Sequence, residues 1–151
     1  MANDITGLDE VTAKLRQLGN QRKAKNSATR ASRKAMNIVK KAAVQNAKAL
    51  DDKATSEKIW KNIVTKPSKT KGDDMVIMKV GVKGGAKQRT DASSSTNSGG
   101  DTWYWRQLEF GNSTNSAKSF IRPALNNNID AVKAEFTRSY SEELDKEIAK
   151  L

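Results

Sequence analysis

Residues 21–50 read QRKAKNSATRASRKAMNIVKKAAVQNAKAL, a 30-residue run without glycine or proline. At 100° per residue its apolar members gather in one arc, which predicts a long α-helix with a single apolar face. Small residues dominate that face, which comprises Ala24, Ala28, Ala31, Ala35, Ile38, Val39, Ala42, Ala49 and Leu50. Alanine lets a neighbouring helix approach closely, whereas a helix lying on a membrane surface would present Leu, Phe or Trp. We therefore expect this face to pack on protein.

The same helix is strongly basic. From Val11 to Leu50 there are eleven Lys and Arg residues and no Asp or Glu, so this segment holds the whole formal net charge of +11. Eight of its basic residues form one face, which we call the basic face: Arg22, Lys23, Arg30, Arg33, Lys34, Lys40, Lys41 and Lys48. Such a face can bind phosphates without sequence preference, but it can equally be solvated or contact acidic subunits. No fold that reads DNA is recognisable beside it.

The chain contains no His and no Cys. This composition removes the commonest general base and the commonest metal ligands, so the sequence predicts no enzyme, no cofactor and no metal. The pairs Asp51/Asp52 and Asp73/Asp74 are interpreted as caps or turn formers. The N-terminus is polar and no apolar run approaches the roughly 18 residues of a membrane span, so we expect a soluble chain made without secretion.

Shorter elements are expected on both sides of the long helix. Leu8, Val11, Leu15 and Leu18 recur at spacings of three and four and predict a short helix, which Gly19 can end in a left-handed conformation. Thr6 and Asp9 match a capping box at its start. After the long helix, two β-rich runs separated by PSKTKGDD predict an antiparallel hairpin over residues 59–83. In its second run, Val76, Met78 and Val80 share one face, while Ile77 and Lys79 share the other.

The C-terminal third combines a polar loop with a second long helix. Residues 84–101, GGAKQRTDASSSTNSGGD, lack apolar periodicity and predict a long flexible loop. Apolar residues at helical spacing from Leu125 to Leu151 predict an amphipathic helix that begins at Pro123. Its acidic surplus is opposite in sign to the basic helix, so a solvent-screened attraction within or between subunits is expected. The prediction is one α+β domain over 1–151, with two long amphipathic helices packed on a small antiparallel β-sheet.

Rigid residues concentrate in residues 103–125, WYWRQLEFGNSTNSAKSFIRPAL, which hold two of the three Trp and two of the three Phe residues. The leading aromatic residues fit a core, a stacking platform for single-stranded nucleic acid, or an interface anchor. We expect core for some and interface for others. Glu109 and Arg122 are predicted to pair with each other or with nearby backbone. Phe110 and Gly111 are predicted to form the packed end of one element.

These residues resemble a known family. An aromatic pair, then Glu-Phe-Gly, then Phe-Ile-Arg-Pro-Ala and a long helix, resembles the minor tail component or tail-completion family of bacteriophages, which is similar to the lambda Z-type tail protein. The opening GLDEVTAKLRQL and the Ala/Lys-rich helix are also similar to it. One departure is LDDKATSEKIWKNI, which replaces the family's Pro, Thr-Gly and Leu. The motif residues are Trp103, Tyr104, Trp105, Glu109, Phe110, Gly111, Phe120, Arg122 and Pro123.

The resemblance implies a non-enzymatic structural protein of the virion neck or tail. It implies a homo-oligomeric ring, commonly hexameric, that completes the tail and joins it to the DNA-filled capsid after assembly in the host cytoplasm. The implied partners are tail-tube, tail-terminator or head-connector proteins, and no membrane. The positive charge would face either DNA in the ring channel or acidic surfaces of neighbouring rings. The small apolar fraction of 36% agrees with a chain that is stabilised by assembly. The alternative hypothesis is a small basic nucleic-acid-binding protein that uses the 21–50 helix.

Overall fold

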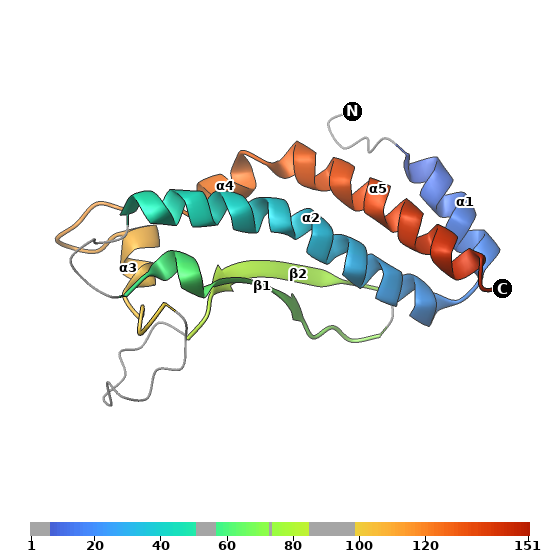
Figure 1. The fold of residues 1–151 in the computed structure, drawn as a ribbon, viewed down its shortest axis with the longest axis horizontal. Coiled ribbons are helices and arrows are strands. Elements are labelled where there is room, and N and C mark those ends of the chain that lie inside the picture. The colour runs from blue at the N-terminus through green and yellow to red at the C-terminus, as the bar shows by residue number, and fades with distance from the viewer. Residues whose placement is uncertain (1–6, 51–56, 73, 85–98) are drawn as a thin grey trace. The chain divides into compact units, whose positions relative to one another are not determined.

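The computed structural model describes residues 7–50, 57–72, 74–84 and 99–151, and its fold is α+β (Figure 1). The chain divides into two compact units. The first unit is Met1–Ile38, Thr65–Lys79 and Asn128–Leu151, and the second unit is Val39–Val64 and Val80–Asn127. The elements are α1 (Leu8–Leu18), α2 (Gln21–Leu50), η1 (Ile59–Asn62), β1 (Ile63–Ser68), β2 (Ile77–Val82), α3 (Trp105–Phe110), α4 (Arg122–Asn126) and α5 (Ile129–Ile148). The helix α2 and both strands contribute residues to both units.

Two residues connect the first two helices. Gly19 ends α1 in the left-handed conformation at φ 60° and donates its backbone N–H to Leu15 O, as the sequence predicts. The side chain of Asn20 then accepts a hydrogen bond from Lys23 N at 3.0 Å and caps the start of α2. At the other end of α1 the capping residue is Gly7, without a side-chain hydrogen bond; the predicted capping residue, Thr6, lies outside the described residues.

The buried stripe of α2 confirms most of the predicted alanine face and extends it. Ala28, Ala31, Ala35 and Val39 are buried as expected, but the stripe continues through Ala43 and Ala47, while Ala49 is exposed. Steps of four residues advance about 40° around a helix, so a long buried stripe drifts out of a fixed arc. Small side chains therefore line α2 along most of its length, which permits close packing in both units.

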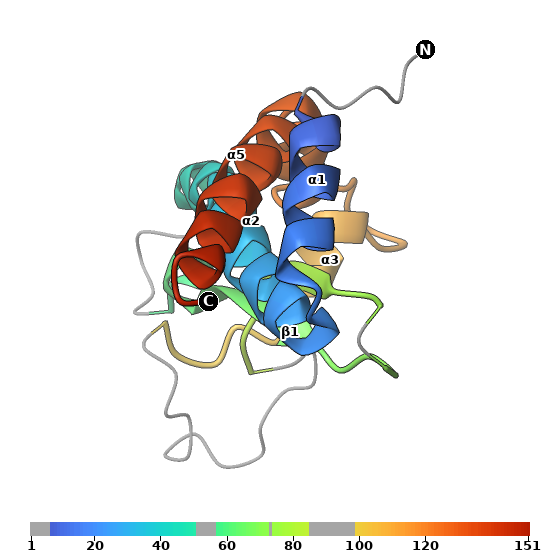
Figure 2. The same ribbon diagram turned by 90° about the vertical axis from the view of Figure 1, so that its right-hand side faces the viewer.

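In the first unit α1 packs against α5 (Figure 2). Val11, Leu18 and Leu144 are buried together, and Leu15, Ala24, Tyr140 and Ile148 pack around them. The Tyr140 hydroxyl donates to Ala24 O of α2 at 3.2 Å. The hydrophobic cluster therefore joins all three helices of this unit.

The strands β1 and β2 form a two-stranded antiparallel sheet. Along β2 the side chains alternate as expected, with Met78 and Val80 half-buried and Ile77 and Lys79 exposed. The hairpin was predicted to begin at residue 59, which is wrong, because Ile59–Asn62 forms a 3₁₀-helix. Ile59 and Asn62, three residues apart, are both buried, which one turn of 3₁₀-helix achieves and alternating strand faces would not.

In the second unit the core lies between α2, the η1–β1 region and the α4 region. Its buried apolar residues are Val39, Ala43, Ala47, Ile59, Ile63, Phe120 and Ala124. The Asn46 side chain of α2 donates to Phe120 O at 3.1 Å, which ties the chain before α4 to α2.

The final helix is interrupted. A single helix was predicted from Pro123 onward, but α4 ends at Asn126 and α5 starts at Ile129, with the turn residues Asn127 and Asn128 between them. Asparagine side chains compete for backbone hydrogen bonds and favour turns and caps, so Asn126–Asn128 is a natural place for the break. Most of the predicted loop over 84–101 lies outside the described residues.

Candidate functional site

The centre of the candidate site is the side chain of Glu109, which lies in α3 and is only 1% exposed. Its two carboxylate oxygens accept hydrogen bonds from three consecutive backbone N–H groups: Phe120 at 2.8 Å, Ile121 at 3.0 Å and Arg122 at 2.9 Å. These donors lie at the start of α4, where backbone N–H groups have no partner within the helix. Glu109 therefore caps α4 from α3, which lies 11–13 residues earlier in the sequence.

Arg122 completes this corner. Its Nε donates to the Glu109 carboxylate at 3.1 Å, and its Nη2 donates to Glu109 O at 2.6 Å and to Ser119 Oγ at 2.7 Å. The Ser119 hydroxyl donates to Glu109 O as well. The Arg122 guanidinium also lies 4.7 Å from the centre of the Phe110 ring. The predicted pairing of Glu109 with Arg122 and with nearby backbone is confirmed.

The pKa of Glu109 is the result of two opposing effects. Burial raises the pKa of the carboxyl, but the hydrogen bonds from Ile121 N, Phe120 N and Arg122 N, together with the Arg122 side chain, outweigh burial. The net result is a pKa below the usual value. The carboxylate is therefore ionised at neutral pH, and each charged oxygen holds backbone in place.

Local sequence explains how the chain returns to this corner. Gly111 ends α3 at φ 76°, and a Cβ at this position would approach Ala117 N to 2.8 Å, so only glycine fits. The Asn112 side chain then accepts hydrogen bonds from Thr114 N and Asn115 N and turns the chain back. Lys118 N donates to Leu108 O at 2.7 Å, so the chain is already beside α3 when it reaches Phe120.

The motif residues fall into buried and exposed groups. Phe120 is fully buried and Pro123 lies in the first turn of α4, as expected. Phe110 is 59% exposed, so the prediction that it forms a packed end is wrong. The reason is helical direction: Glu109 points into the protein, and the next residue along α3, about 100° further round, points out. Phe110 instead stacks on Arg122.

The three leading aromatic residues are half-buried. Trp103 and Tyr104 meet edge to face with ring centres 6.1 Å apart, and Trp105 has the Arg106 guanidinium 5.4 Å from its ring centre. Tyr104 and Leu108 also line an open pocket of about 570 Å³, whose other walls are polar residues between Asn112 and Lys118. Their proposed use as interface anchors stays a prediction.

Sequence reasoning missed a second buried polar residue, Asn62. Its Nδ2 donates to Gly100 O at 3.0 Å and to Thr102 Oγ1 at 2.8 Å, and its Oδ1 accepts from Gly99 N at 2.9 Å. Its backbone carbonyl accepts from Lys83 N at 2.7 Å. Asn62 thus holds the chain on both sides of the segment 84–98. The pair Gly99-Gly100 was a sequence signal for a close approach of two backbone segments. In the structure, a Cβ on Gly99 would lie only 2.1 Å from Lys58 O.

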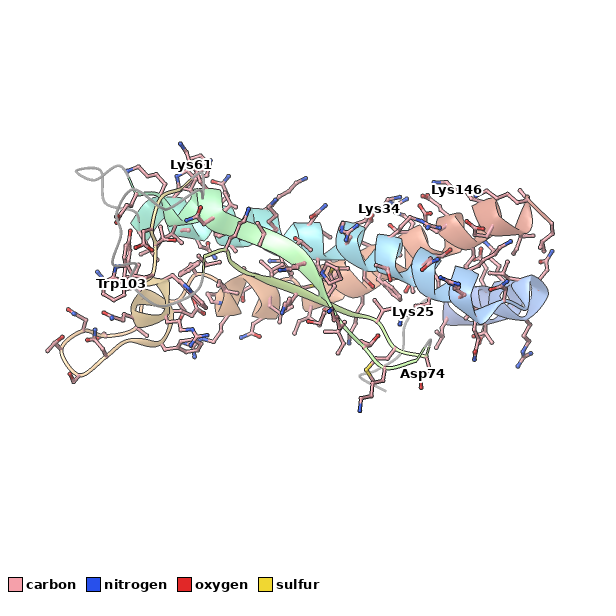
Figure 3. The ribbon with its side chains drawn as sticks, turned by 90° about the horizontal axis from the view of Figure 1, so that it is seen from below. Lys25, Lys34, Lys61, Asp74, Trp103 and Lys146 are labelled. Atoms are coloured by element: carbon pink, nitrogen blue, oxygen red, sulfur yellow. The ribbon has the colours of Figure 1, made fainter. Side chains whose placement is uncertain are left out.

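Part of the basic face is neutralised within the first unit. Arg30 Nε lies 2.7 Å from one Glu143 oxygen, and Lys34 Nζ lies 3.1 Å from the other. Arg30 also reaches Glu147 at 3.4 Å. The expected attraction between the basic and acidic helices therefore exists within one chain, and Figure 3 shows Lys34 of α2 and Lys146 of α5, both partners of Glu143.

Hydrogen bonding from these cations controls the acidity of Glu143. The Arg30 side chain lowers the pKa most, burial opposes it, and Lys34 and Lys146 lower it further, to about 2. The other basic-face residues are exposed or half-buried: Arg22, Lys23, Arg33, Lys40, Lys41 and Lys48. Lys48 lies over the ring of Trp60 at 4.7 Å, a contact within the second unit.

The described residues contain no group of three or more carboxylates that could hold a metal ion. Of the two carboxylate pairs, only the exposed Asp74 belongs to the described residues. No helix in the same part of the chain is long and apolar enough to cross a membrane.

The chain belongs to the HK97-gp10-like family, a bacteriophage HK97-gp10 tail-component family, whose model matches residues 9–111. No curated protein and no solved structure matches the chain. The match covers most of α1, all of α2, the hairpin and α3, and it ends at Gly111, the last residue of Glu-Phe-Gly. The resemblance to a phage tail component is thus confirmed, and it places the chain in the virion. The partners of the Glu109 carboxylate lie just beyond the matched residues.

Proposed function

We propose that this chain is a structural protein of the phage neck or of the head-proximal end of the tail. It forms a ring, with six copies as the expected number, completes the tail and helps join it to the DNA-filled capsid. The observation that carries this proposal is the tail-component family match over residues 9–111. The charged side chains of the site fix the course of the backbone, which agrees with a structural role.

The exposed apolar residues support assembly. Seven large hydrophobic side chains are exposed in the described part of the chain: Leu8, Met75, Ile77, Phe110, Leu125, Ile129 and Leu151. Single exposed residues are common, but several around a core in which six of the thirteen buried apolar residues are alanine suit a subunit that gains stability from its neighbours. The neighbours in this proposal are further copies, tail-tube, tail-terminator or connector proteins, and DNA passing through the ring.

The alternative of a nucleic-acid-binding protein loses support from the ion pairs. Arg30 and Lys34 are two of the eight basic-face residues, and Glu143 binds both of them. Phosphate binding would have to compete with these contacts or use the remaining residues. DNA affinity with a steep salt dependence, lost in an Arg33→Glu, Lys40→Glu, Lys41→Glu variant, would restore this alternative as the leading one.

The direct test adds purified protein to tail tubes of the same phage. Negative-stain images should show a density that caps one end of each tube, and light scattering of the free protein should show a ring-sized oligomer. The double variant Lys83→Glu, Lys118→Glu changes two exposed charges whose side chains take no part in the Glu109 hydrogen bonds, and it should behave like the native protein. Tubes that remain uncapped at saturating protein would contradict the proposal.

A further inference from the structure

The β-hairpin and its turn carry a combination of exposed basic and apolar side chains, which we call the hairpin patch. It consists of four exposed lysines and two exposed apolar residues: Lys66, Lys69, Lys71, Lys79, Met75 and Ile77. Met75 is 55% exposed and Ile77 is 44% exposed. Residues 65–79 contain these four lysines and two aspartates, so the segment has a net charge of +2. No described Asp or Glu makes an ion pair with any of the four lysines.

The hairpin is held firmly from its inner side. Lys25 of α2 donates to Thr70 Oγ1 at 3.0 Å and to Gly72 O at 2.5 Å, and Thr70 Oγ1 in turn donates to Met75 O. Figure 3 shows Lys25 beside the turn that carries Asp74. Thr65 of β1 also donates to the Asn37 side chain of α2. Because α2 anchors the inner side, the hairpin patch is presented on a fixed surface rather than on a free loop.

A surface of opposite sign lies on α1 and α5, and we call it the helix patch. Its acids are Glu10, Glu135, Glu142 and Asp145, and its cations are Lys14 and Arg138. Four acids and two cations give a net charge of −2. Ion pairs inside the patch keep the side chains ordered, yet Glu10, Glu142 and Asp145 remain 64%, 51% and 60% exposed.

The two patches lie on different elements of the first unit, the hairpin patch within residues 66–79 and the helix patch on α1 and α5. The hairpin turn also approaches α1 and α5 directly, because Met75 lines one pocket together with Leu15 and Tyr140. One chain therefore presents a basic surface and an acidic surface on different elements. Two different complementary surfaces on one subunit produce a head-to-tail contact, which closes into a ring when the rotation between copies allows it.

We propose that the hairpin patch of one copy binds the helix patch of the next copy in the ring. This inference rests on the proposed ring, and it names the surfaces that form it. The two patches carry charges of opposite sign, and the exposed Ile77 favours an apolar contact that a phosphate backbone does not offer. The contact is consequently electrostatic at its rim and weakens as salt rises.

The test reverses the charges of each patch separately and then together. One variant carries Lys66→Glu and Lys79→Glu, and the other carries Glu142→Lys and Asp145→Lys. Each places like charges opposite each other, so we expect assembly to require on the order of tenfold more protein in sedimentation experiments. The fourfold variant and an equal mixture of the two double variants restore opposite charges, and both should assemble like the native chain. The variant Lys83→Glu, Lys118→Glu is the matched control.

The outcomes separate this contact from the ring itself. A native chain that stays monomeric, with and without tail tubes, would contradict the ring and this contact with it. A native chain that assembles while both double variants assemble equally well would overturn this contact alone. Loss of assembly in both variants without recovery in the fourfold variant would show that the two patches do not bind each other. Circular dichroism of each variant confirms that these exposed substitutions leave the helices intact.

Discussion

Two buried glutamates use their charge in different ways. Glu109 binds three backbone N–H groups and one arginine, whereas Glu143 binds only side-chain cations, from Arg30, Lys34 and Lys146. Both have a pKa below the usual value. The first carboxylate determines where the chain turns, and the second neutralises part of a basic helix. Removal of a carboxylate that binds backbone should therefore cost much stability, and the loss should not depend on salt. Removal of a carboxylate that binds partly exposed cations should cost less stability, and the loss should shrink as salt rises.

The largest effect is expected for Glu109→Ala. The substitution leaves three consecutive N–H groups without an acceptor at a nearly buried site, at about 1 kcal/mol or more for each. We expect a loss of about 3 kcal/mol or more in the free energy of unfolding, measured by urea denaturation. Glu109→Gln keeps the shape and one acceptor oxygen and should lose less. A Glu109→Ala protein as stable as the native one would show that Glu109 does not hold the corner.

The next largest effect is expected for Gly111→Ala. A side chain there must adopt φ 76° and meets Ala117 N at 2.8 Å, so the return of the chain to Glu109 is strained. The expected loss is about 1–3 kcal/mol in the same denaturation experiment. The control is Gly81→Ala in β2, where nothing lies within 4 Å of the added Cβ. Equal losses for the two variants would contradict a special role for the backbone at Gly111.

A smaller effect is expected for Glu143→Gln. The Arg30 and Lys34 side chains are 43% and 45% exposed, so solvent screens much of their attraction. We expect a loss of about 1 kcal/mol at low salt that shrinks in about 1 M NaCl. The same salt series on Glu109→Gln should leave its loss nearly unchanged. If the loss of unfolding free energy in Glu143→Gln did not change with salt, the two glutamates would not differ in the way their charges are used.

Acid should destabilise the chain through both residues. A carboxyl whose pKa is lowered by folding stabilises the folded state above its unfolded pKa, and that stabilisation disappears as pH falls through the folded pKa. For Glu143 this stabilisation is lost between its ordinary pKa of 4.5 and its folded-state pKa of about 2. The free energy of unfolding should decrease from about pH 5 toward pH 2 and decrease less steeply in Glu143→Gln. Identical slopes for the two proteins would contradict the ion-pair assignment.

Sequence periodicity predicted the long helices better than the junctions. The segment 21–50 is helical over its full length because it has regular apolar spacing and no helix breaker. The turn at Gly19, the β2 alternation and the Glu109–Arg122 pair were also predictable, since each depends on residue types with few conformational options. The family match over residues 9–111 confirms the predicted class, a phage tail component.

Local patterns could not predict features that depend on distant residues. Ile59–Asn62 reads as a strand, yet Asn62 is buried by its bonds to Gly99 and Gly100 in a 3₁₀-turn. Phe110 was expected to form the packed end of an element, but its neighbour Glu109 takes the inward position. The break between α4 and α5 follows from three successive asparagines, whose local preference for turns was not used in the prediction. Of these three features, only the 3₁₀-turn depends on tertiary contacts that outweigh the propensity of its segment.

The central claim is that this chain completes phage tails. The most direct measurement uses filled heads, together with tails produced without this protein, and counts infectious particles after purified protein is added. Native protein and the Lys83→Glu, Lys118→Glu control should raise the count strongly, and Glu109→Ala should raise it much less. No increase with native, folded protein would contradict the account.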